Sequence, residues 1–196
     1  MAFFNQVKGP AGFQPKRKFR FLVVFPKLTN LTFMAKTAKK PTYSLDATEH
    51  NVLNHVFKFP GVVKWEDVDV SLIDAVDPNT GSKFWNALRN SGYVTPNVPD
   101  GLVHGVTKVG AHAALGNVKI QQLDGGGITV PTDAGLEPIG SINPQIVDEW
   151  TLHNCFIKSV NWGDLDYGAE DLIQVDVGLV YDYATYAENV DSYTTT

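Results

Sequence analysis

The sequence has a single cysteine, Cys155, among its 196 residues, so no disulfide can form within one chain. It also lacks any apolar run close to the roughly 18 residues that a membrane-spanning helix needs, which argues against insertion into a membrane. The first residues show no basic stretch followed by an apolar one, as a secretory signal peptide would. We therefore expect the chain to fold in a reducing cytoplasm.

Acidic residues are absent from the first 40 positions, which contain nine Lys or Arg. Residues 121–196 show the opposite bias, with thirteen Asp or Glu and one base, Lys158, whereas residues 41–120 are nearly balanced. Such an asymmetry indicates an interaction arm or complementary surfaces on different copies. The alternative is that the two ends of the chain pair with each other within one subunit.

Short runs of alternating apolar residues predict strands. We expect strands over residues 18–25, 31–37, 43–48, 62–74, 118–122, 150–162 and 172–183. A hairpin with a loose tip is expected between Leu45 and Phe59, as indicated by the turn residues Asn51, Asn54, Pro60 and Gly61. In residues 62–74 the alternation slips at Glu66–Asp67, which predicts a β-bulge within one long, bent strand.

One short helix is predicted, with Phe84, Trp85 and Leu88 on one face. Asp77–Thr80 supplies its N-terminal cap and Gly92 follows its end. Residues 93–114 contain two prolines and three glycines and are predicted to be a loop, and residues 124–146 a long irregular connection. The fold class expected is all-β and mainly antiparallel: a β-sandwich or barrel with one short flanking α-helix, an N-terminal arm and a long loop.

Candidate metal ligands are His50, His55, His153 and Cys155, but their spacing fits no zinc pattern. His153 and Cys155, two residues apart on an expected strand, would share one face. As a nucleophile, Cys155 would need an adjacent base and an oxyanion site, and the interior of a strand offers no such site. A half-buried histidine beside a packed thiol is the simpler interpretation.

Two further patterns contain residue types found in ligand-binding sites. The glycines of residues 125–127 could form a phosphate-binding loop, but no Lys-Ser/Thr pair follows and no helix begins there. The carboxylates of Asp164, Asp166, Glu170 and Asp171 could hold Ca²⁺, although the twelve-residue loop pattern of an EF-hand is missing. We therefore predict no catalytic, cofactor-binding or metal-binding residues, no cofactor and no enzymatic activity.

Three segments together resemble the tail tube proteins of phages with contractile tails, the T4-like tail tube family. They are FMAKTAKKPTYSLDATE (33–49), FKFPGVVKWEDVDVSLIDAVDP (57–78) with the helix FWNALRNSG (84–92), and DEWTLHNCFIKSVNWGDLDYGAEDLIQVDVGLVYDYATY (148–186). The last is the most specific, because a Trp-Thr-Leu strand, a Gly-Asp-Leu-Asp-Tyr turn and a strand ending in Tyr-Asp-Tyr are how these proteins typically finish. The resemblance covers the chain from about Phe19 to Tyr186.

This resemblance implies a structural virion protein, made and assembled in the host cytoplasm. Its domains would be an assembly arm (1–17), a single tail-tube β-barrel (18–190) and a flexible C-terminal tail (191–196). Six subunits would form a ring, and rings would stack head to tail into the inner tail tube. The implied partners are other copies, the tail sheath protein outside, and baseplate and terminator proteins at the ends. DNA would pass through the lumen without specific binding during ejection into the host.

Other functions are compatible with the same sequence. The chain could be a tube initiator or terminator, or the inner tube of a phage-like contractile injection system. From a different class, it could be a DNA-binding module in which Lys16, Arg17, Lys18 and Arg20 neutralise phosphates. For a DNA conduit we expect a neutral or acidic lumen wall, with Asp176 and Asp182 on the polar face of the closing strand.

Overall fold

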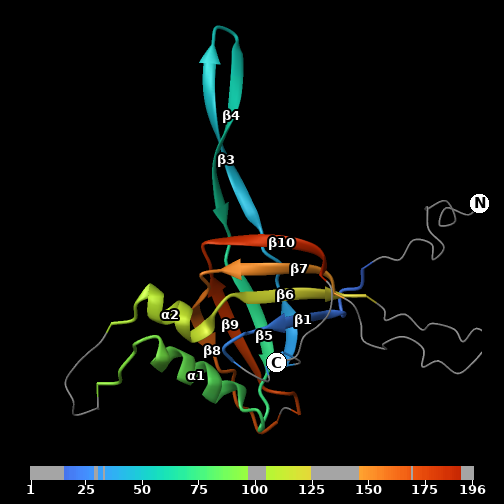
Figure 1. The fold of residues 1–196 in the computed structure, drawn as a ribbon, viewed down its shortest axis with the longest axis vertical. Coiled ribbons are helices and arrows are strands. Elements are labelled where there is room, and N and C mark those ends of the chain that lie inside the picture. The colour runs from blue at the N-terminus through green and yellow to red at the C-terminus, as the bar shows by residue number, and fades with distance from the viewer. Residues whose placement is uncertain are drawn as a thin grey trace, which may run out of the picture.

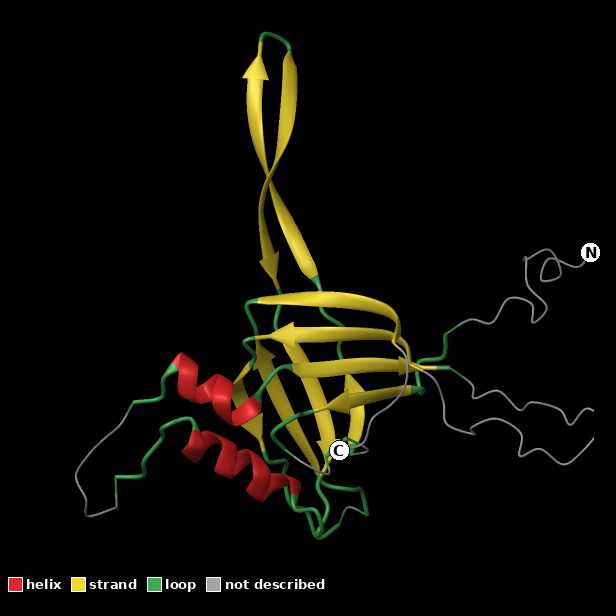
Figure 2. Ribbon diagram, viewed as in Figure 1, coloured by secondary structure: helices red, strands yellow, loops and turns green. Residues whose placement is uncertain are grey.

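The computed structural model describes residues 16–28, 31–32, 34–96, 105–124, 146–168 and 170–190. Within these ranges the chain forms two packed antiparallel sheets, a long two-stranded hairpin and a pair of helices (Figure 1, Figure 2). The elements are β1 (Phe21–Val24), β2 (Ala35–Ala38), β3 (Tyr43–Val52), β4 (His55–Trp65), β5 (Val68–Ile73), α1 (Thr80–Asn90), α2 (Lys108–Leu115), β6 (Val118–Leu123), β7 (Ile146–His153), β8 (Phe156–Asn161), β9 (Gln174–Val180) and β10 (Tyr183–Val190).

The core lies between the two sheets. One sheet has the order β1-β6-β7-β10 and the other β2-β5-β9-β8, and all pairings are antiparallel. Each strand alternates, so Val70 and its cross-strand partner Val177 point inward while Asp69 and Asp176 are exposed. Val23, Ile120 and Leu152 of the first sheet join the same buried cluster. The predicted all-β sandwich is confirmed.

Three of the predicted strands are wrong in the same way, because each is two strands in different sheets. Residues 62–74 break at Glu66–Asp67, where the chain leaves the hairpin for β5. Residues 150–162 break at Asn154–Cys155, between β7 and β8, where Asn154 has a φ of 53°. Residues 172–183 break at Tyr181–Asp182, between β9 and β10. Both halves of such a segment alternate whichever sheet they join, so the slip at Glu66–Asp67 was interpreted as a bulge and not as a change of sheet.

These three corners lie together at one end of the sandwich. The backbone N–H of Asp182 donates to the carbonyl of His153 at 3.1 Å, and Asn154 Nδ2 donates to Asp182 Oδ2 at 2.8 Å. The ring of Tyr181 lies 5.9 Å from that of Trp65, the last residue of β4. The hairpin therefore leaves the body from the end that carries the corners (Figure 1).

The hairpin is longer than the sequence indicated. Its register runs from Tyr43 opposite Trp65 to Val52 opposite His55, so the turn is at Leu53–Asn54 and β4 continues through Pro60–Gly61. The pairing register of β3 and β4 shifts opposite Pro60–Gly61. These two residues, which usually indicate a turn, therefore lie at an irregularity within β4. A Cβ at Gly61 would lie 2.8 Å from the carbonyl oxygen of Asp46, so the glycine permits this close approach of the two strands.

The predicted helix is confirmed as α1. Asn79 is its N-cap, and its Oδ1 accepts from the N–H of Ser82 at 2.6 Å. Gly92 follows with a φ of 110°. The second helix, α2, was predicted to be a loop. Its Gly110, which indicated a loop in the sequence, is the point where α2 packs against the end of α1.

Replacing Gly110 with alanine is expected to destabilise the fold by about 1–3 kcal/mol, the usual cost of overpacking. A Cβ there would lie 2.7 Å from the carbonyl oxygen of Ser91 and 3.1 Å from Thr107 Oγ1, so α2 must move away from α1. Gly105→Ala is the matched control, since its Cβ would meet nothing within 4 Å. Urea unfolding of both variants measures the difference. Equal stability of the two would contradict the packing role of Gly110.

Some predictions lie outside the described residues. These are the arm up to residue 15, the glycines of residues 125–127 and most of the 124–146 connection, and the tail over residues 191–196. Within the part of the chain that is described, no helix is both long and apolar enough to cross a membrane.

Candidate assembly interface

The candidate metal and thiol groups do not come together. His50 and His55 are in the hairpin, which projects away from the body that carries His153 and Cys155 (Figure 1). Because Asn154 turns the chain, His153 and Cys155 do not share a face: His153 stacks on Tyr183, while Cys155 is buried in the core. Burial raises the pKa of the Cys155 thiol to about 12, so it stays protonated at neutral pH.

The acidic segment between β8 and β9 is exposed. The described residues contain no group of three His, Cys, Asp or Glu side chains placed to hold a metal ion. Asp166 instead accepts a hydrogen bond from the N–H of Gly168 at 2.8 Å, as a turn residue does. The calcium interpretation therefore finds no support in the geometry.

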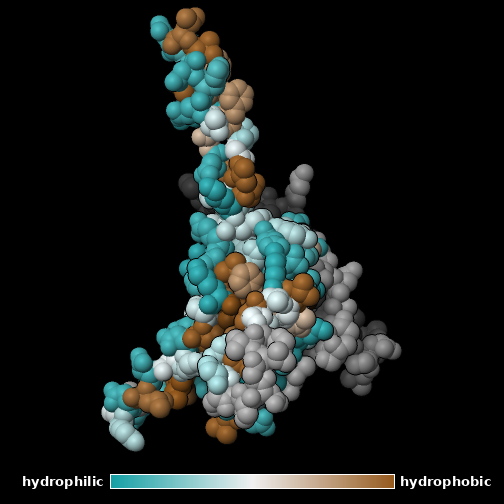
Figure 3. Space-filling view, turned by 90° about the vertical axis from the view of Figure 1, so that its left-hand side faces the viewer, coloured by the Kyte–Doolittle hydropathy of each residue, from teal (hydrophilic) through white to brown (hydrophobic). Residues whose placement is uncertain are grey.

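The most conspicuous surface is the hairpin itself, residues 43–65, which we call the hairpin arm. Every residue from Tyr43 to Lys64 is exposed, and apolar side chains lie along its whole length (Figure 3). These are Tyr43, Leu45, Val52, Leu53, Val56, Phe57, Phe59, Val62 and Val63. Its charges pair within the arm, Lys64 with Asp46 and Lys58 with Glu49. So much exposed apolar surface on a two-stranded ribbon is typical of a protein-binding element.

A second exposed surface lies at the opposite end of the body. It is the connection between β8 and β9, residues 162–173, which we call the distal loop. Leu165, Tyr167 and Leu172 in this loop are largely exposed. The loop borders an open hollow of about 720 Å³.

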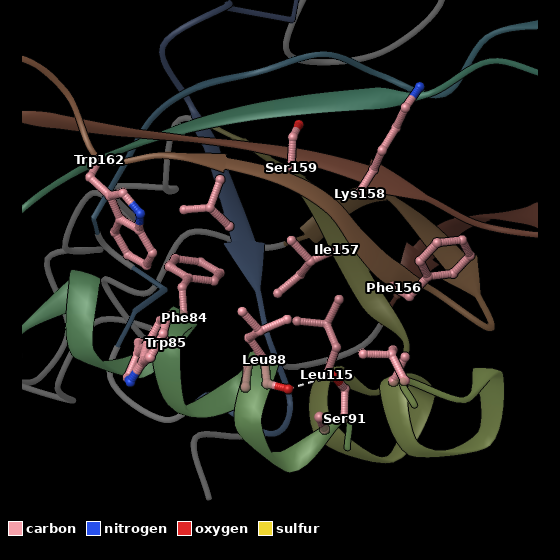
Figure 4. Close-up of a pocket in the computed structure, with 15 residues that line it drawn as sticks. Phe84, Trp85, Leu88, Ser91, Leu115, Phe156, Ile157, Lys158, Ser159 and Trp162 are labelled. Carbon is pink, nitrogen blue, oxygen red and sulfur yellow. Dashed lines mark hydrogen bonds between the residues drawn. The ribbon is translucent and has the colours of Figure 1, made fainter. Parts of the chain in front are cut away.

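An apolar groove separates the helices from β8 (Figure 4). It has a volume of about 260 Å³ and is lined by α1, α2 and β8, with Leu115 and Ile157 among its apolar side chains. Trp85, Leu88 and Trp162 are partly exposed at its border. The helices therefore cover the β8 side of the sandwich incompletely.

The first sheet ends in two strands that have no further neighbour in the described ranges. β10 pairs on one side only, with β7, and β1 on one side only, with β6. In the second sheet α2 contacts the edge strand β8. Unprotected edge strands present backbone N–H and C=O groups to which another chain can add. The eight-residue strand β10 is the longer of the two free edges.

The charge asymmetry is partly resolved within the subunit. The carboxylate of Asp148, nearly buried on β7, pairs with Lys16 and lies 3.8 Å from Lys40 Nζ. Lys16, proposed as a phosphate contact, is thus engaged by an acid of its own chain.

The prediction that Asp176 and Asp182 share one polar face is wrong. Asp176 accepts from Ser71 on β5, whereas Asp182 lies at the corner, where hydrogen bonds from Lys108 and Asn154 lower the pKa of its carboxyl.

The comparisons show the fold. No protein-family profile and no curated protein match the sequence. Among solved structures, a chain of the six-fold symmetrised baseplate of the anti-feeding prophage has a TM-score of 0.54 at 17% identity, covering 90% of this chain and 97% of that one. A chain of that system's tube-terminating cap gives 0.55 at 16% identity, covering 90% and 93%. A chain of the sheath–tube complex of an extracellular contractile injection system, PVC, gives 0.55 at 14% identity, covering 89% and 92%.

At these identities the likeness shows the fold alone. The chain shares its β-sandwich fold with chains found in structures of contractile injection systems, in agreement with the β-sandwich or barrel that the sequence resemblance implied. Neither the distal loop nor the free edge of β10 was predicted from the sequence as a candidate interface. The sequence did contain one indication of the distal loop, because the apolar residues Leu165, Tyr167 and Leu172 are interspersed among acidic residues.

Proposed function

We propose that the chain is a structural, non-enzymatic tube subunit of a contractile tail or injection machine, forming hexameric rings that stack head to tail. The hairpin arm is the observation that carries this proposal. It projects beyond a well-packed sandwich and exposes apolar groups that a neighbouring protein would cover (Figure 1, Figure 3). The shared fold with chains of contractile systems supports the same function.

Ring closure would use the free edges of the first sheet. In this arrangement β10 of one copy pairs with β1 of the next, so the four-stranded sheet continues from subunit to subunit. Such a contact joins two different surfaces, and a rotation of one sixth of a turn closes it into a ring in which the first sheet has no exposed edge. Residues 1–17 would serve as an assembly arm, and residues 18–190 as the barrel domain.

The proposed partners are other copies of the chain, a sheath protein outside the tube, and baseplate and terminator proteins at its ends. The structures that share the fold come from a baseplate, a tube-terminating cap and a sheath–tube complex. In a phage tail the particle would be the virion, assembled in the host cytoplasm, and DNA would leave through the lumen. The inner tube of a phage-like injection system is the alternative that these comparisons favour.

Purified protein is expected to form rings about six subunits in size, and tubes as its concentration rises. Negative-stain electron microscopy and sedimentation velocity over a range of salt and protein concentrations test this. Copy number in the native particle separates a main tube subunit, with many copies, from an initiator or terminator with one ring. A protein that stays monomeric under all conditions and is missing from any tail-like particle would contradict the proposal.

A further inference from the structure

Asp148, on β7 of the first sheet, is a nearly buried carboxylate held between two lysines. Its Oδ2 accepts a hydrogen bond from Lys16 Nζ. Its Oδ1 is buried and has no hydrogen-bond partner among the described residues, and the ammonium of Lys40 lies 3.8 Å from it. Both lysine side chains are about half exposed. A carboxylate withdrawn from water to this degree depends on its cations, because their attraction offsets its lost hydration.

The two lysines belong to the roots of two different projecting segments. Lys16 is at the end of the proposed assembly arm, residues 1–17. Gln122, the cross-strand partner of Asp148, holds the same stretch, since its Nε2 donates to the carbonyl of Arg17 at 2.7 Å. Lys40 lies in the connector between β2 of the second sheet and β3 of the hairpin arm. One carboxylate of the first sheet therefore contacts the roots of both segments, and we call Lys16, Asp148 and Lys40 the root clamp.

Two contacts between side chains hold the root of the hairpin arm against the body. On the β4 side, the ring of Trp65 packs against that of Tyr181 with centroids 5.9 Å apart. On the β3 side, the ion pair between Lys40 and Asp148 reaches across to the first sheet. Two separate contacts fix the tilt of a two-stranded ribbon, whereas one contact alone lets the ribbon pivot about its root. The root clamp therefore supplies the second point that defines the direction of the arm.

Resting on the proposed tube function, we propose that Asp148 is a positioning residue for assembly, which acts through Lys16 and Lys40 to set the directions in which the assembly arm and the hairpin arm leave the body. The physical reason is preorganisation. An arm that already points in one direction loses less conformational entropy on meeting a neighbour than an arm that pivots. Loss of the root clamp weakens assembly although every group at the contact surfaces is still present.

Spin labels measure the direction of the hairpin arm in the isolated subunit. Leu53 at the tip and Val109 on α2 are 99% and 81% exposed, and the native thiol Cys155 is buried, so L53C/V109C accepts one label at each position. Double electron–electron resonance on dilute protein is expected to give one narrow distance distribution. Adding D148N or K40Q to this labelled protein is expected to broaden it.

K36Q is the matched control, because it removes the same charge from another exposed lysine, on β2, close to the root of the arm. It is expected to leave the distance distribution unchanged. If D148N and K40Q give a distribution as narrow as that of K36Q, the direction of the hairpin arm does not depend on the root clamp and the proposal is wrong. This comparison needs no tubes, so it tests the root clamp even if the proposed function fails.

Tube formation by the full-length protein tests the consequence for assembly. K40Q is expected to raise the concentration needed for tubes about tenfold or more. Its thermal unfolding should match that of K36Q, since Lys40 is about half exposed. Tubes that form as readily with K40Q as with K36Q would overturn the positioning role. Absence of rings and tubes in the unmodified protein would instead refute the proposed function.

Thermal unfolding separates this role from that of an ion pair that only stabilises the fold. K16Q leaves the buried Asp148 with Lys40, 3.8 Å away, as its remaining ion-pair partner in the described residues, so its midpoint should fall further than that of D148N. D148N returns two half-exposed lysines to water, and K16Q/D148N should match it. A fall in D148N as large as that in K16Q would show that Asp148 supports the fold itself, and would overturn its assignment as a positioning residue.

Discussion

Replacing residues 46–62 with an Asn-Gly turn is expected to give a folded subunit that forms no tubes. Leu45 and Val63 are cross-strand partners, so a two-residue turn can join them. The removed residues are all exposed and belong to no part of the buried core. The midpoint of thermal unfolding should therefore change by no more than about 3 °C, which corresponds to about 1 kcal/mol or less for a domain of this size. Electron microscopy should show single rings or smaller species at every concentration.

This result depends on the arm acting between subunits. If the shortened protein lost its cooperative unfolding transition, the arm would belong to the folding unit and our assignment would be wrong. If it formed tubes as readily as the unmodified protein, the arm would not be the stacking element. The two failures are distinguished by circular dichroism and microscopy of the same sample.

Phe84→Ala is expected to destabilise the subunit by about 3–5 kcal/mol, the usual range for removing a buried aromatic side chain. Phe84 is 1% exposed, and its ring meets that of Phe25 edge to face with centroids 5.8 Å apart. Its loss leaves a cavity that the paired helices and the sheets cannot close without moving. Denaturant unfolding measures the change, as a lower midpoint with an unchanged slope.

Trp85→Ala is the matched control, since Trp85 follows Phe84 on α1 but is 41% exposed at the border of the groove. We expect it to cost about 1 kcal/mol or less. A cost for Phe84→Ala no larger than that for Trp85→Ala would show that α1 is not a structural part of the core. Assembly of both variants at a temperature where they are folded separates stability from interface effects.

Alternation in the sequence identified most of the strand-forming segments. The pattern Val68, Val70, Leu72 places these side chains on the inner face of β5, where the structure has them. The cap at Asn79 and the terminator at Gly92 also located α1, because caps act through hydrogen bonds within a few residues. The all-β class follows from such local signals.

The same local signals could not tell where a strand changes sheet. The breaks at Asn154–Cys155 and Tyr181–Asp182 lie within segments predicted as single strands, and the slip at Glu66–Asp67 predicted a bulge. Only packing of the two halves on different layers shows that each is a change of sheet. Helix α2 was missed for a related reason. Gly110 reads as a loop residue in isolation, yet it is required because the carbonyl of Ser91, on a segment distant in sequence, approaches it.

The sequence by itself determined the fold class, the inward face of strands such as β5, and the short helix α1, since these depend on residue type and on spacing over a few positions. Only the tertiary structure decided how the strands divide between two sheets and that the hairpin arm stands free of the body. It also placed the distal loop at the other end. These features arise from contacts between segments far apart in the chain, which no local period records.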